Sequence, residues 1–163
     1  MPGREPPSPP RIPPNVRLHR SELWGLPFLV ALPLLAVLGV FGPTMETARG
    51  QSGAVSWSVE YPSRLRYEMA ERLLVRVENR SPAPVSDVVL GFDPAYIHAF
   101  TNVAFDPAPE APYAVSILDL EPGEARLVVV QLTADEYGPH RGRVHLTAGA
   151  SRTTAELSTF IFP

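Results

Sequence analysis

A single uncharged, apolar stretch divides this chain into unequal parts. No charged side chain lies between Leu23 and Met45, and most of those 23 residues are Leu, Val, Ala, Phe or Gly. At a helical rise of about 1.5 Å per residue the stretch reaches about 34 Å, enough to cross a hydrocarbon core about 30 Å thick. It therefore predicts a transmembrane helix over residues 22–44, with residues 23–43 in contact with the lipid bilayer.

The residues before this stretch predict a cytoplasmic tail. Residues 1–21 contain seven prolines before position 15, a composition typical of extended or disordered chain. Arginines flank the apolar stretch mostly on its N-terminal side: Arg11, Arg17 and Arg20 precede it, and only Arg49 lies close after it. Because positive charge stays on the cytoplasmic side, the tail is expected inside and the rest of the chain outside.

A cleaved signal peptide is the alternative to a permanent anchor. Ser52, Gly53 and Ala54 are small residues that suit a cleavage site. The apolar stretch is longer than the 7–15 residues of a signal-peptide core, and these small residues lie well beyond its end. We therefore expect an uncleaved anchor, followed by a linker over residues 45–54.

Composition excludes several kinds of chemistry and points to a source. The chain has no cysteine, which rules out disulfides, thiolate zinc sites and a cysteine nucleophile. Residues 43–163 carry ten arginines and fifteen acidic residues, a balance of 10 − 15 = −5, so no basic surface for nucleic acid is expected. All fourteen basic residues are arginine, which together with the abundant proline and alanine is typical of GC-rich bacteria. We therefore expect an inner-membrane anchor with a periplasmic C-terminal domain.

Residues 55–163 have the sequence pattern of an antiparallel β domain. Apolar and polar residues alternate in short runs, and Pro, Gly, Asn or Asp separate one run from the next. The runs are 55–59, 73–77, 85–92, 113–118, 126–133, 144–148 and 155–161. About seven strands over this length predict a two-sheet β-sandwich, with one face of each sheet turned inward.

The order of the turns adds a resemblance to a known kind of module. A strand ends in Val77-Glu78-Asn79, a Leu120-to-Glu124 turn (LEPGE) follows, and Gly138 and Gly142 precede a Val-x-Leu strand. In this respect residues 55–163 resemble bacterial extracytoplasmic Ig-like modules of the cell-adhesion-related and fibronectin-like kind. The resemblance implies an Ig-like sandwich and no particular activity.

No catalytic or cofactor motif stands out. The sequence lacks a Gly-x-Ser-x-Gly elbow and a Ser-x-x-Lys motif. His98, His140 and His145 could bind copper or zinc only if the fold gathered them, and His145 is expected to point outward. We therefore predict that the protein is not an enzyme, with no catalytic residue, no cofactor and no metal site.

Aromatic residues are the best candidates for contact with other proteins. The loop over residues 94–112 holds Tyr96, Phe100 and Phe105, and the terminal strand carries Phe160 and Phe162 in the outward register. Exposed aromatic side chains mark interfaces. The alternative for the loop is a further edge strand or a flap packed over the end of the sandwich, and the alternative for Phe160 and Phe162 is closure of the open end of the sandwich. We therefore expect a membrane-anchored periplasmic protein-binding module, an accessory or assembly subunit of a larger membrane complex. The alternative is an envelope-binding module that recognises glycan or another envelope ligand.

Overall fold

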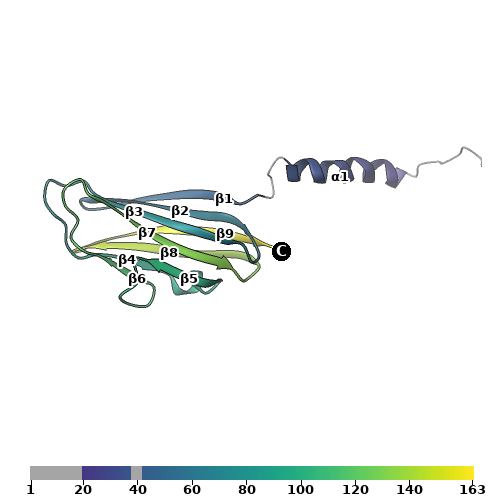
Figure 1. Ribbon diagram of the computed structural model, residues 1–163. Coiled ribbons are helices and arrows are strands. Elements are labelled where there is room, and N and C mark those ends of the chain that lie inside the picture. The colour runs from purple at the N-terminus through teal and green to yellow at the C-terminus, as the bar shows by residue number, and fades with distance from the viewer. Residues whose placement is uncertain (1–19, 38–41) are drawn as a thin grey trace, which may run out of the picture. The chain divides into compact units, whose positions relative to one another are not determined.

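The computed structural model describes residues 20–37 and 42–163 (Figure 1). The chain divides into two compact units, one within residues 1–41 and the other from Gly42 to Pro163. The tail predicted over residues 1–21 lies almost entirely outside the described residues. The second unit, called the β domain below, contains all the strands that the structure describes and the core.

Helix α1 (Arg20–Val37) contains Pro27 and Pro33. Those of its side chains that the structure describes are exposed. Its exposed apolar side chains include Phe28, Leu29 and Val30, which are 68%, 71% and 52% accessible. Successive helical residues point 100° apart, so these three neighbours occupy different sides of the helix. No helix in residues 20–37 and 42–163 is long and apolar enough to span a membrane. Within the described residues α1 ends at Val37 and Thr44 begins a strand, so the predicted end of the helix at residue 44 is wrong.

The linker predicted over residues 45–54 is instead a β-hairpin. Strand β1 (Thr44–Ser52) pairs antiparallel with β2 (Val55–Arg66) through a two-residue turn, in which Gly53 adopts a φ of +58°. Strand β1 is mostly exposed and carries few apolar residues, so alternation could not reveal it. The β domain therefore starts about ten residues earlier than the sequence pattern indicates.

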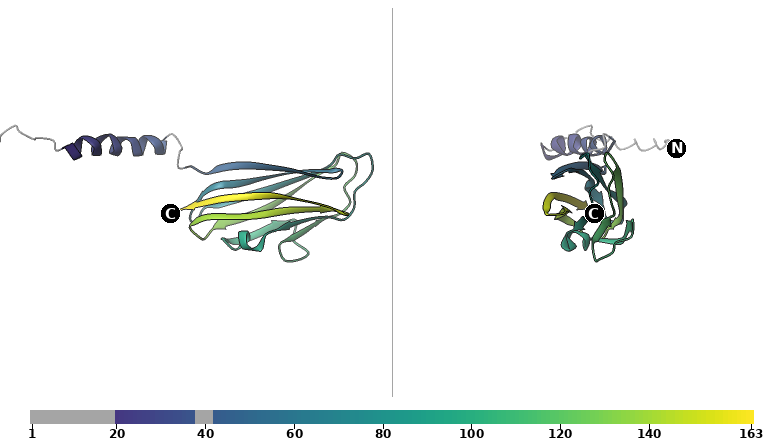
Figure 2. Two further views of the ribbon diagram at one scale, coloured as in Figure 1. Left: turned by 180° about the vertical axis from the view of Figure 1, so that it is seen from behind. Right: turned by 90° about the vertical axis from the view of Figure 1, so that its left-hand side faces the viewer.

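Within the described residues, nine strands form one curled sheet. Figure 1 shows the sheet from the side, and the right-hand view of Figure 2 looks along the strands. Its order is β5-β7-β3-β2-β9-β8-β4-β6, and β1 adds to β2. The remaining elements are β3 (Ala70–Asn79), β4 (Val88–Phe92), α2 (Pro94–Ile97), β5 (Phe100–Asp106), β6 (Ala114–Ile117), β7 (Ala125–Ala134), β8 (Gly138–Ala148) and β9 (Ser151–Phe162). Each of the seven predicted runs overlaps a strand. Strand β1 was missed, and β5 corresponds to the edge strand that was the alternative for the loop over residues 94–112.

Strand β2 joins the two layers into which the sheet curls. Residues 55–60 pair antiparallel with β3, whereas residues 64–66 run parallel to β9. Pro62 lies where the partner changes, and its carbonyl accepts a hydrogen bond from Thr159 Oγ1 at 2.6 Å. The inward side chains of both layers form one core, which confirms an all-β, sandwich-like fold.

A buried asparagine organises one end of the core. Asn79 is fully buried, and its Nδ2 donates to the carbonyls of Ala83 and Leu120, both at 2.8 Å. Its Oδ1 accepts from the backbone N–H of Ser81 at 2.9 Å. The asparagine therefore fixes the turn predicted after β3, and its side-chain groups are fully satisfied despite burial.

Candidate functional site

The aromatic residues predicted to form a docking loop belong largely to the core. Tyr96 and Phe100 are only 1% and 6% exposed, and their rings pack together at a centroid distance of 5.2 Å. Phe105, on β5, is half-buried and packs against Phe92. The prediction that Tyr96 and Phe100 offer an exposed contact surface is therefore wrong, because folding already buries these rings.

A short helix turns Tyr96 inward. Asp93 caps α2 by accepting a hydrogen bond from the backbone N–H of Ala95 at 3.1 Å, and Pro94 occupies the first turn. An acidic cap followed by proline is a helix-start signal, whereas the sequence pattern used these two residues only as the separator after the run 85–92. Tyr96 Oη then lies 2.8 Å from Thr159 Oγ1, and the Tyr96 side chain packs on Gly142, where a Cβ would collide with it.

The burial of Tyr96 predicts a loss of stability at high pH. Burial raises the pKa of Tyr96 to about 12, although the hydrogen bond between Tyr96 and Thr159 opposes the change. Because the unfolded state ionises at lower pH, the free energy of unfolding should fall by about 2 kcal/mol between pH 9 and pH 12. Urea titrations across this range should show that Tyr96→Phe lacks this component of the decline. Equal pH dependence in both proteins would contradict the assignment.

Phe160 and Phe162 lie on the outward side of β9, as the register predicts. Phe160 is 41% exposed, and the two rings meet edge to face at a centroid distance of 4.7 Å. Phe105 belongs to β5, at the far end of the strand order from β9. The five aromatic residues named from the sequence therefore do not form one site.

An apolar groove between β6 and β7 is a better candidate. Leu118 and Leu127 are large apolar side chains that are 78% and 55% exposed. They line a hollow of about 390 Å³. The remaining lining residues are Pro107, Ser116, Ile117, Arg126 and Val128. We call this hollow the leucine groove.

Within residues 42–163, two strand edges that have no strand partner border the leucine groove. Strand β5 pairs with β7 only from Val129 onward, so residues 125–128 have a strand neighbour on one side alone. Among the described strands, β6 pairs only with β4. Exposed backbone N–H and C=O groups at such edges readily accept another strand. The continuous apolar run over residues 127–130 was the available sequence signal, because it places apolar residues on both faces of β7.

The three histidines of the β domain lie apart. His98 Nε2 is 2.8 Å from Tyr113 Oη, and His140 Nε2 is 2.9 Å from the carbonyl of Glu136. The His145 ring covers Gly91, and partial burial lowers the pKa of His145, as does Arg152. Within the described residues, no group of three His, Cys, Asp or Glu is placed to hold a metal ion.

Comparisons with known proteins give no family. No family model matches the sequence, and no curated protein matches it. A family 123 glycoside hydrolase from Clostridium perfringens is 12% identical over 61% of this chain, with a TM-score of 0.44, and this chain spans only 22% of its length. The CARDB domain of a Pyrococcus furiosus protein in complex with di-metal ions is 12% identical, with a TM-score of 0.42. The match covers 74% of this chain and 89% of the CARDB domain.

The cupredoxin domain of amoB from Nitrosocaldus yellowstonii gives similar values. It is 9% identical, with a TM-score of 0.40 and coverage of 74% of this chain and 90% of its own. These TM-scores are too low to carry an activity, a metal or a ligand from any of these proteins to this chain. Any function proposed for this chain therefore rests on its own residues.

Proposed function

We propose that this chain is a membrane-anchored module that binds an extended apolar segment of a partner protein in the leucine groove. The observation that carries the proposal is the pair of exposed leucines between two unpaired strand edges. An added strand would satisfy the free backbone groups, and its alternate side chains would cover Leu118 and Leu127. Burial of each leucine contributes about 1.5–3 kcal/mol.

The anchor is supported by the surface of α1. Its exposed apolar side chains point in several directions, and a helix that is apolar all round is normally buried in protein or lipid. The sequence continues apolar after Val37, through Leu38, Val40 and Phe41. With arginines concentrated before the stretch, the proposed topology has a cytoplasmic N-terminus and a periplasmic β domain in the bacterial inner membrane. In this setting the module acts as an accessory subunit of a larger membrane complex.

Co-purification tests both parts of this proposal. The tagged full chain and its Leu118→Ser/Leu127→Ser variant are expressed in the source bacterium, and membranes are washed with carbonate and extracted with mild detergent. Both proteins should remain in the washed membrane. The wild type should retain a stoichiometric membrane partner. The variant should retain at least tenfold less of it, because removal of the interface leucines should reduce the binding free energy by about 1.4 kcal/mol or more.

Tyr137→Ser is the matched control. Tyr137 is 57% exposed, like Leu127, but lies between β7 and β8 at the other end of β7. Its removal should leave partner retention unchanged. Equal retention by the leucine variant and the control would place the interface elsewhere. Release of the wild-type chain by carbonate would instead contradict the membrane anchor. It would not change the conclusion about partner binding in the leucine groove.

A further inference from the structure

Two arginines flank a serine on the outward face of β1, β2 and β3. Ser58 on β2 is the cross-strand partner of Arg49 on β1 and of Arg76 on β3. Neighbouring strands lie about 4.8 Å apart, so the two arginines stand about 10 Å apart in one row. Serine is much shorter than arginine, and the row therefore forms a trough with a hydroxyl at its floor.

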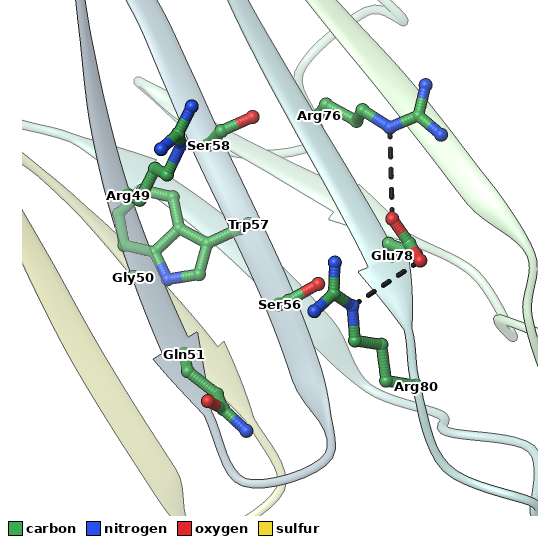
Figure 3. A pocket seen from close by; sticks show the side chains of 9 residues that line it. All are labelled: Arg49, Gly50, Gln51, Ser56, Trp57, Ser58, Arg76, Glu78 and Arg80. Carbon is green, nitrogen blue, oxygen red and sulfur yellow. Dashed lines mark ion pairs between the residues drawn. The ribbon is translucent and has the colours of Figure 1, made fainter.

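The next row brings a third arginine to the same hollow. Ser56 pairs with Gln51 on one side and with Glu78 on the other. Glu78 holds two guanidinium groups, with Arg76 Nε at 4.0 Å and Arg80 Nε at 3.4 Å. Figure 3 shows both ion pairs at Nε, with the terminal nitrogens of Arg76 and Arg80 pointing elsewhere. These terminal nitrogens keep donors for a ligand.

The trough carries an excess of positive charge in an otherwise acidic domain. Three arginines and one glutamate line it, a balance of 3 − 1 = +2, and the hollow measures about 470 Å³. Within the described residues, Arg49 makes no ion pair with an acidic side chain. Glu60, the next outward residue on β2 after Ser58, does not line the hollow. The arrangement therefore favours an anion.

A buried tryptophan holds the edge strand that supplies Arg49. Trp57 is 3% exposed, and its indole Nε1 donates to Thr153 Oγ1 on β9 at 2.9 Å. Gly50 covers the indole so closely that a Cβ at this position would collide with it. Strand β1 is thus fixed against the core, and the spacing of Arg49 and Arg76 is set before any ligand arrives.

We propose that this trough is a binding site for an oxyanion, the carboxylate or phosphate group of a polar ligand. Guanidinium groups bind both groups through paired N–H donors, and the Ser58 hydroxyl adds a donor between them. The site is open, and its arginines are solvated, so a single small anion should bind with millimolar affinity. The trough adjoins the leucine groove, because Arg76 is the cross-strand partner of Leu127. Arg49 lies on the side of the trough away from the leucine groove. Its replacement therefore tests anion binding without changing the leucine groove.

Calorimetric titration of the detergent-solubilised full chain tests the site. The probes are inorganic phosphate and glucuronate at low ionic strength, with glucose as the neutral analogue of glucuronate. At least one anion should bind, and glucose should not. Arg49→Gln should weaken binding at least tenfold, and Arg49→Gln with Arg76→Gln should abolish it. Tighter binding of phosphate would assign a phosphate ligand, and tighter binding of glucuronate an acidic saccharide.

Arg141→Gln is the matched control, because Arg141 is an exposed arginine on β8, outside the trough. It should leave the affinity unchanged, and all variants should keep the wild-type circular dichroism spectrum. Equal affinity in the wild type and the double variant would overturn the proposal. An equal loss in Arg141→Gln, binding of glucose comparable to glucuronate, or no binding of either anion would also overturn it.

Discussion

Replacement of Val75 by aspartate is expected to unfold the β domain. Val75 is fully buried on β3, between Val59 on β2 and Val128 on β7, which are themselves buried. A carboxyl group at this position would find no hydrogen-bond partner and no counter-ion among these side chains. The expected loss exceeds about 4 kcal/mol, a large part of the 5–15 kcal/mol by which domains are usually stable.

Urea unfolding of residues 42–163, followed by circular dichroism, measures this effect. The matched control is Arg72→Asp on the same strand, where the side chain is exposed and points away from the core. This control should change the free energy of unfolding by about 0.5 kcal/mol or less. A folded Val75→Asp domain with an unchanged urea midpoint would show that the inward face of β3 has been misassigned.

Truncation of Tyr96 to alanine is expected to have the second-largest effect. The ring is 1% exposed, packs on Phe100 and Gly142, and carries a hydroxyl bonded to Thr159. Loss of a buried aromatic ring costs about 3–5 kcal/mol, because the cavity left behind closes only in part. Tyr96→Phe removes only the hydrogen bond and should cost about 1 kcal/mol.

The same urea titrations distinguish a core role from a docking role for Tyr96. If the ring were an exposed anchor for a partner, Tyr96→Ala would leave the free energy of unfolding within about 0.5 kcal/mol of the wild type. A loss confined to Tyr96→Ala, with Tyr96→Phe close to the wild type, would show that packing of the ring stabilises the fold. Similar losses in both variants would instead assign most of the effect to the hydroxyl.

The location of Tyr96 changes where recognition is expected. The apolar side chains of the long loop over residues 94–112 left two interpretations open, a docking surface and a segment packed over the end of the sandwich. In the structure, α2 and β5 occupy most of that loop, and they bury Tyr96 and Phe100 against the core. Leu118 and Leu127 are exposed apolar side chains, and they belong to neither of the aromatic segments named from the sequence.

The sequence by itself determined the β architecture and much of the core. Side chains alternate across a strand, so the register of Val75 and Leu157 toward the core could be read directly from their neighbours. The same rule placed Phe160 on the outer side of β9. Turn residues marked most strand ends, because Asn, Asp, Gly and Pro favour turn geometry through local interactions alone.

Only the tertiary structure decided which surfaces are available for binding. The sequence does not reveal that β5 stops short of residues 125–128, or that Ser58 lies between Arg49 and Arg76, residues from three different strands. Pairing between distant strands creates both the leucine groove and the arginine trough. Edge strand β1 was also hidden, because an exposed strand needs few apolar residues and leaves little periodic signal. Local preferences specify each strand, whereas the exposure of a side chain depends on which distant strands pack beside it.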